Sequence, residues 1–150
     1  MSKKIREIIG EDREAYSVHL DVSIWQAIEY MREKKVGALA IRDDNGVVGV
    51  FSEQDVLRRV ALEALNLAEV AVREVMSSPA YWISIDERCE VAKAIMVHKA
   101  FDHLVVLDAE HTFRGFVSAR ELLEDDLADS KDLVGKLNDE YFLHGVDLTL

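Results

Sequence analysis

The sequence predicts an α+β protein built from two β-α-β-β-α repeats related by a pseudo-two-fold axis, with a short N-terminal helix and a C-terminal tail. Two observations predict this class. The segment GVFSEQD at 49–55 returns as GFVSARE at 115–121. The window YSVHLDVSIWQAIEYM at 16–31 aligns with YWISIDERCEVAKAIM at 81–96, at a constant offset of 65 residues. Two copies of one supersecondary unit favour a packed pair, because solenoids stack more copies than this.

The first copy shows the expected elements in chain order. A short extended segment, SVHL at 17–20, ends at an aspartate. A helix follows, because apolar residues then recur at helical spacing. Strands are expected at 36–41 and 47–51, on either side of DDNG at 43–46, whose Asn-Gly pair is a hairpin signal. A second helix is expected to begin just after Ser52. The apolar face of the first helix is predicted to comprise Ile24, Ala27, Ile28 and Met31.

The second copy repeats this pattern with different residues. Cys89, Ala92 and Met96 take the apolar helix positions, and His103–Leu107 is the matching strand. A leader segment precedes each copy, IREII at 5–9 and VREVM at 72–76. We assign residues 2–66 to the first repeat, 69–127 to the second and 128–150 to a C-terminal extension, as a helix or a tail. The extension is expected either to add dimer interface or to bind a target.

Composition narrows the classes of function. The formal net charge is −11, which argues against binding to nucleic acid or to an anionic membrane surface. No apolar run is long enough to span a bilayer, and the N-terminus has no secretory signal pattern. The single cysteine fits a reducing cytoplasm, where we expect the protein to work. His98 and His103 straddle a helix end and do not form a same-face metal pair, so we assign no metal ligands.

The serine and the acid of each motif allow two interpretations. Ser-x-x-acid at the start of a helix is a capping box, in which the two residues satisfy each other's backbone N–H groups. Ser118 with Glu121 fits this rule well, and Ser52 with Asp55 fits it less well, because Asp is shorter than Glu. The same corner could instead bind a ligand, with the carboxylate accepting ribose hydroxyls. The preceding glycine, Gly49 in the first copy, would let a planar base approach the backbone. Neither interpretation needs a nucleophile or a general base, so we assign no catalytic residues.

The ordered set of motifs, present twice, resembles a tandem pair of CBS (cystathionine β-synthase) domains, or Bateman module. The segments that show this resemblance are DVSIWQAIEYM at 21–31, GALAIRDDNGVVGVFSEQD at 37–55, VREVMSSP at 72–79 and DHLVVLDAEHTFRGFVSARE at 102–121. The resemblance covers about residues 2–127. It implies a non-catalytic sensor of adenosine-containing ligands, namely AMP, ADP, ATP, S-adenosylmethionine or NAD(H). It also implies a homodimer in which ligands bind in clefts between the repeats.

The resemblance places the ribose-binding acid at Asp55, and Glu121 stands where the family prefers Asp. We therefore rank the Asp55 site above the Glu121 site. Gln54 replaces an arginine that is frequent in the family, and Arg58 or Arg59 would supply the positive charge. His103 and Ala38 hold positions from which a basic residue often reaches phosphate. The full ligand-binding set implied by the resemblance is Val18, Ala38, Leu39, Ser52, Asp55, Arg58, Met76, Pro79, His103, Leu104, Ser118 and Glu121.

The function expected on this basis is regulation of an unknown target protein by an adenosine-containing ligand, with one, two or no working sites per chain. The alternative is a CBS-pair scaffold for interaction or dimerisation that binds no ligand and uses both Ser-x-x-acid motifs only as caps.

Overall fold

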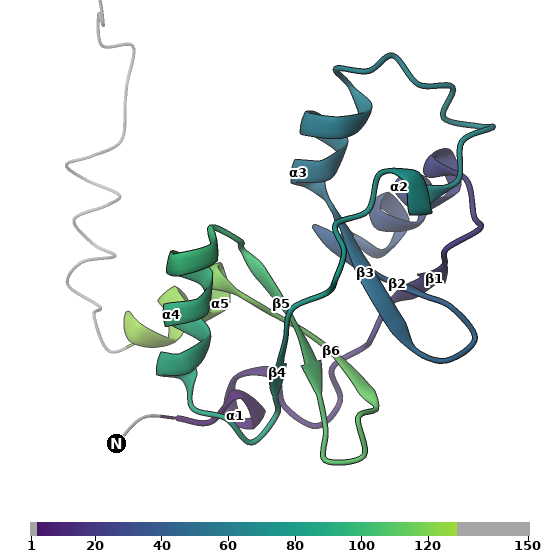
Figure 1. Cartoon of the computed structure of the whole chain (residues 1–150). Helices are drawn as coiled ribbons and strands as arrows, with labels where there is room; N and C mark the ends of the chain where they lie inside the picture. Colours follow the sequence, from purple (N-terminus) through teal and green to yellow (C-terminus); the bar gives the residue numbers. More distant parts are fainter. Residues whose placement is uncertain (1–2, 129–150) are drawn as a thin grey trace, which may run out of the picture.

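The computed structural model describes residues 3–128 and contains two three-stranded sheets. In each sheet the first two strands are parallel and the last two are antiparallel. The two β-α-β-β-α repeats are therefore confirmed (Figure 1). The proposed roles of the C-terminal extension concern residues that lie almost wholly outside the described part. The first sheet comprises β1 (Ser17–His19), β2 (Ala38–Arg42) and β3 (Val47–Ser52), and the second comprises β4 (Trp82–Ser84), β5 (His103–Leu107) and β6 (Phe113–Ser118).

One long helix connects the parallel strands of each repeat, and its buried face is the predicted one. In α2 (Ile24–Lys34) the buried residues are Ile24, Ala27 and Met31, while Ile28 is partly buried against the same core. Ser23 begins this helix with a capping box, because its Oγ accepts from the N–H of Gln26 and its own N–H donates to the Gln26 side chain. In α4 (Cys89–Lys99) the buried residues are Cys89, Ala92 and Met96.

The helix after each Ser-x-x-acid motif differs between the repeats. In the second repeat it is a regular helix, α5 (Ala119–Asp126), as predicted. In the first repeat only α3 (Glu53–Asp55) is α-helical, and a π-helical turn, η1 (Val56–Val60), follows. The Ala61 N–H donates to the Val56 carbonyl across this wider turn, at 2.9 Å. The turn brings Val60 into the first core, where 5% of its surface is exposed. The pattern of polar and apolar residues alone does not distinguish this π-helical turn from a regular α-helix.

The leader segments are exchanged between the repeats. The N-terminal helix α1 (Ile5–Ile9) places Ile5 and Ile9 in the core of the second repeat, beside α4 and α5 (Figure 1). The 3₁₀ turn η2 (Val72–Glu74) places Val72 in the core of the first repeat. The backbone bonds are equivalent, because Arg6 N–H donates to the Ile85 carbonyl and Arg73 N–H donates to the Leu20 carbonyl. The leader that precedes the first repeat in sequence thus packs in the core of the second repeat, and the leader that precedes the second repeat packs in the core of the first.

The chain crosses closely over Gly49 on its way between the repeats. A Cβ at Gly49 would lie 2.7 Å from Met76 Sδ and 2.9 Å from the carbonyl oxygen of Ser77. At the matching Gly115, where φ is +110°, a Cβ would lie 2.8 Å from Arg13 Cγ. The crossing segments of the protein itself therefore occupy the space beside these glycines, where the sequence predicts the approach of a base. Within residues 3–128, no helix is long and apolar enough to cross a membrane.

Candidate functional site: two clefts between the repeats

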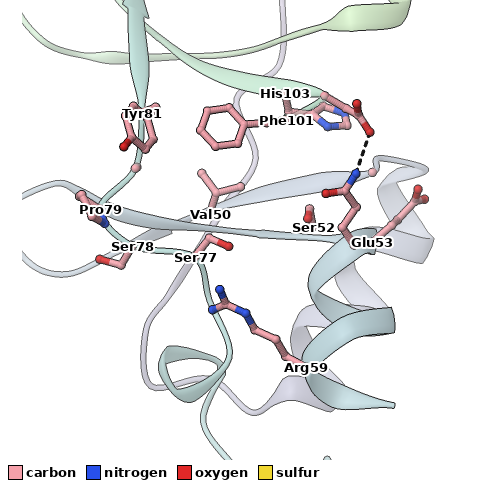
Figure 2. A pocket seen from close by; sticks show the side chains of 14 residues that line it. Val50, Ser52, Glu53, Arg59, Ser77, Ser78, Pro79, Tyr81, Phe101 and His103 are labelled. Atoms are coloured by element: carbon pink, nitrogen blue, oxygen red, sulfur yellow. Dashed lines mark hydrogen bonds between the residues drawn. The ribbon is translucent and has the colours of Figure 1, made fainter. Parts of the chain in front are cut away.

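A cleft of about 200 Å³ lies at the carboxyl end of β3, and residues of both repeats line it (Figure 2). Val50, Pro79, Tyr81 and Phe101 supply an apolar wall, and the rings of Tyr81 and Phe101 lie 5.1 Å apart, centroid to centroid. This first cleft suits a flat apolar group against that wall and a polar group toward β3. It is lined by Gly37, Val50, Ser52, Glu53, Gln54, Arg59, Ser77, Ser78, Pro79, Ala80, Tyr81, Phe101, Asp102 and His103.

The carboxylate of Asp55 lies directly beneath this cleft. Only 6% of Asp55 is exposed, and it is the single buried charged residue of the described chain. Its Oδ2 accepts from the N–H and the Oγ of Ser52, at 2.9 and 3.2 Å, while its Oδ1 accepts from Ser77 Oγ at 2.8 Å. Ser52 and Ser77 line the cleft, so two neutral hydroxyls stand between the carboxylate and the cavity. A hydroxyl can rotate away, which leaves this carboxylate available to another donor.

The rim of the first cleft carries charges of both signs. Arg59 holds its Nη1 2.7 Å from the carbonyl oxygen of Met76, and its Nε lies 3.8 Å from Asp55 Oδ1. Glu53 and Asp102 line the same cleft. The Gln54 side-chain amide donates to Asp102 Oδ2 at 3.1 Å, the dashed line in Figure 2, and so joins the two repeats across the mouth.

A second cleft, of about 260 Å³, lies at the equivalent position at the end of β6. Tyr16, Ala38 and Ser118 take the places that Tyr81, His103 and Ser52 hold in the first cleft. The two clefts are therefore related by the same pseudo-symmetry as the repeats. The second cleft is lined by Arg13, Glu14, Tyr16, Val36, Gly37, Ala38, His103, Phe116, Ser118 and Glu121.

Glu121 has a charged partner in this second cleft. The two guanidinium Nη atoms of Arg13 donate to its two carboxylate oxygens, one each. Glu121 also forms a complete capping box with Ser118, as predicted. Burial opposes ionisation of Glu121, but Arg13 and Ser118 outweigh it, so the pKa of Glu121 is lowered. Hydrogen bonding to Glu121 outweighs burial for Arg13, and the pKa of Arg13 is raised.

His103 lines both clefts. Its ring stands edge-on to Phe116, with centroids 6.1 Å apart. Burial lowers the pKa of His103, although Asp102, Glu53 and Glu121 oppose this effect. The lowered pKa of His103 favours its neutral imidazole, which offers one donor and one acceptor between the clefts.

Comparison with known proteins gives the family. The CBS domain model matches the chain twice, at residues 5–62 and 72–127, once for each repeat. The chain belongs to the CBS-domain family. A CBS-domain protein from Burkholderia ambifaria is 26% identical with a TM-score of 0.80, over 86% of this chain and 97% of that one. A CBS-domain protein from Pyrobaculum aerophilum, solved with AMP, is 22% identical with a TM-score of 0.71, over 91% and 98%.

The curated relatives include longer proteins. An uncharacterized protein from Methanopyrus kandleri is 30% identical over 97 residues, which is 63% of this chain and 48% of that protein. This CBS pair thus spans about half the length of that relative.

The residues that the family resemblance implied lie in the clefts, on the exposed surface, in or against the hydrophobic cores, and over Gly49. Ser52, Pro79 and His103 line the first cleft, with Asp55 beneath it, and Ala38, His103, Ser118 and Glu121 line the second. Arg58 is exposed and lines neither cleft, whereas Arg59 lines the first. Three others belong to the hydrophobic cores or pack against them: Val18, Leu39 and Leu104. Met76 lies over Gly49.

Several residues of the two CBS clefts escaped the sequence analysis. Tyr16 and Tyr81 had a usable signal, because they align at the repeat offset. Ser77 lies within VREVMSSP at 72–79, between Met76 and Pro79, so the family resemblance already pointed to its segment. Arg13 had no signal, since it lies in a segment that follows a leader and has no periodic pattern. Only the crossing of these segments over the sheets brings them to the acids. Among residues 3–128, no group of three His, Cys, Asp or Glu side chains is placed to hold a metal ion.

Proposed function

We propose that this chain is a non-catalytic regulatory module that binds an adenosine-containing ligand in the first cleft. The observation that carries this proposal is a buried carboxylate, Asp55, beneath a cleft whose walls come from both CBS repeats. A ligand there touches both repeats, so its binding energy can change how they sit together. Binding of AMP by the Pyrobaculum aerophilum protein supports this, as does another CBS pair that was solved with 5′-methylthioadenosine and S-adenosylmethionine.

Each part of the cleft has a proposed role. The base packs on the apolar wall that includes Val50 and Phe101. The ribose hydroxyls donate to Asp55 after the Ser77 hydroxyl rotates aside, and Ser52 stays on the carboxylate as part of the cap. Arg59 faces the 5′ substituent of the ribose.

The charge of the rim bears on which ligand is preferred. Glu53 and Asp102 line the first cleft beside Arg59, and the whole chain carries a net charge of −11. A polyphosphate tail would meet this negative field, whereas one phosphate can be matched by Arg59. We therefore expect AMP or S-adenosylmethionine to bind more tightly than ADP, ATP or NAD(H).

The test is the thermal stability of the protein with each of these ligands. A ligand at 100 times its dissociation constant stabilises the native state by about 2.7 kcal/mol, a rise in Tm of roughly 5–10 °C for a chain of this size. Asp55→Ala, compared with its own ligand-free form, should lose most of this rise. Glu33→Ala, which removes an exposed acid of α2, is the matched control and should keep it. No rise with any adenosine compound would contradict the proposal.

A second candidate is an interaction scaffold that binds no ligand. One observation favours it, namely that protein groups already satisfy both acids, Asp55 through two serines and Glu121 through Arg13. If the chain is such a scaffold, Asp55→Ala lowers its stability, and no ligand raises the Tm of the natural chain or of the variant. The same ligand panel therefore separates the two candidates.

We further propose that the module forms a homodimer in the cytoplasm and signals to a target protein. The exposed face of α4 carries Val91 and Ala94 beside Ile95 and forms an apolar groove. Burying this face against a second copy would remove apolar surface from water. Sedimentation equilibrium should give the mass of a dimer for the natural chain and of a monomer for Val91→Asp. A monomer in both cases would contradict the dimer.

A further inference from the structure

Arg13 fills the place in the second cleft where a ligand would meet Glu121. Arg13 lies in the segment between α1 and β1. Its Nη1 is 3.0 Å from Glu121 Oε1 and 3.2 Å from the carbonyl oxygen of Phe116, and its Nη2 donates to Glu121 Oε2. All three residues line the second cleft. The pair is a bidentate guanidinium–carboxylate contact, the strongest common form of ion pair in proteins.

This contact places a charged donor at both carboxylate oxygens of Glu121. Its Oε1 also accepts from the N–H and the Oγ of Ser118, at 3.2 Å each. Oε1 thus accepts three hydrogen bonds and Oε2 accepts one, and a guanidinium N–H points at each oxygen. The side chains of Arg13 and Glu121 are 30% and 25% exposed, so solvent screens the pair only partly. The hydroxyls of a ribose could bind Glu121 only after they displaced the bidentate guanidinium of Arg13.

The arginine of the first cleft does not bind its acid in this way, because Arg59 Nε lies 3.8 Å from Asp55 Oδ1 and Arg59 Nη1 donates to the Met76 carbonyl oxygen instead. The residue aligned with Arg13 at the repeat offset is Ser78, whose Oγ donates to the Val48 carbonyl oxygen at 3.0 Å. Ser78 is neutral, and the hydrogen bonds to Asp55 come from the Ser52 N–H and from two rotatable hydroxyls. Arg13 is also held in place, because its aliphatic stem lies against Gly115. The two clefts therefore differ in access to their acids despite their common fold.

We propose that Arg13 is an internal ligand of Glu121 that closes the second cleft, so that each chain binds one adenosine-containing ligand, at the Asp55 cleft. Arg13 thus determines how many sites work. This inference rests on the proposed function for its ligand class, and it goes beyond that proposal in assigning the closed site and the residue that closes it.

The experiment is calorimetric titration of the full chain with AMP. Arg13→Met keeps the stem over Gly115 and removes the guanidinium, so the stoichiometry should rise from about one to about two ligands per chain. Arg114→Met is the matched control. Arg114 pairs with Glu11 and Asp108, lines neither cleft, and its replacement removes the same charge. This control should keep the natural stoichiometry.

Two double variants locate the new site. Arg13→Met with Glu121→Gln should return to about one ligand per chain, because the second cleft then has no carboxylate for the diol. Arg13→Met with Asp55→Ala should also bind about one, now in the second cleft. If Arg13→Met fails to fold, Arg13→Gln retains a neutral hydrogen-bonding group and replaces it in each titration.

The outcomes separate this inference from the proposed function. Two ligands on the natural chain, or one on a folded Arg13→Met, overturn the closed cleft and leave the function of the first cleft intact. No binding to the natural chain with one ligand on Arg13→Met removes the first-cleft proposal and supports the closure. No binding in either protein overturns both.

Discussion

Asp55 and Glu121 occupy equivalent corners of the two repeats, yet their partners set them apart. Two neutral serines donate to Asp55, and Arg59 Nε lies 3.8 Å away. Arg13 donates to both carboxylate oxygens of Glu121, which also accepts from Ser118. The longer Glu side chain satisfies the cap and still reaches Arg13. The extra methylene of Glu121 and the presence of Arg13 in a crossing segment thus give the two equivalent acids different hydrogen-bond partners.

The motif glycines are required by close packing of the crossing segments. Gly49→Ala places a methyl group 2.7 Å from Met76 Sδ and 2.9 Å from a backbone oxygen that cannot move alone. We expect a loss of about 1–3 kcal/mol in the free energy of unfolding, measured by urea denaturation. Gly49→Ala combined with Met76→Ala should lose less than the sum of the single changes, because one of the two clashing atoms is gone. Simple additivity would contradict this account of the glycine.

His103 should give the fold a dependence on pH. Its pKa is lowered in the native state by burial, so the unfolded chain takes up the proton first as the pH falls. Stability from this residue is therefore complete above the unfolded value of about 6.5 and declines below it, until the native imidazole also protonates. Urea midpoints of the natural chain should fall between about pH 7 and 5 more steeply than those of His103→Gln. Equal slopes would show that His103 is not the source, since the other histidines are unchanged.

At the scale of elements, the exchanged leaders decide which core a mutation damages. Ile5 belongs to the first copy in sequence but is fully buried in the second core. Val72 does the reverse. The interchange places each leader beside the strand end of the other repeat, where its N–H groups find carbonyl partners. This also carries residues such as Arg13 and Ser77 across to the clefts.

Ile5→Ala should destabilise the protein by about 2–5 kcal/mol, because it leaves a cavity in the second core. Hydrogen exchange should show the largest loss of protection in β5 and β6, not in β2 and β3. Ile8→Ala, on the same helix but only partly buried, is the matched control and should cost less. Loss of protection confined to the first sheet would contradict the exchange.

At the scale of the whole molecule, the exchange makes the two repeats one cooperative unit. Neither core is complete without a segment from the other half of the chain. Unfolding one repeat should therefore remove packing from the other, and the chain should unfold in a single transition.

The two tryptophans allow this to be measured, since Trp25 lies in the first repeat and Trp82 in the second. In Trp82→Phe the fluorescence reports the first repeat, and in Trp25→Phe it reports the second. We expect each variant's fluorescence midpoint in urea to coincide with its own midpoint by circular dichroism. A fluorescence midpoint that differs from the circular dichroism midpoint would show that the repeats unfold independently.

The sequence by itself determined the two repeats, the helix faces, the hairpins and the serine–acid corners, because these depend on periodicity and turn chemistry within short segments. The tertiary structure alone decided which leader fills which core, the π-helical turn after Asp55, and the contacts of Asp55 with Ser77 and of Glu121 with Arg13. These features join residues far apart in the chain, such as Arg13 with Glu121, through packing that no local pattern encodes. The repeat offset shows that the corners are alike, and only the crossing of the chain over each sheet makes their clefts different.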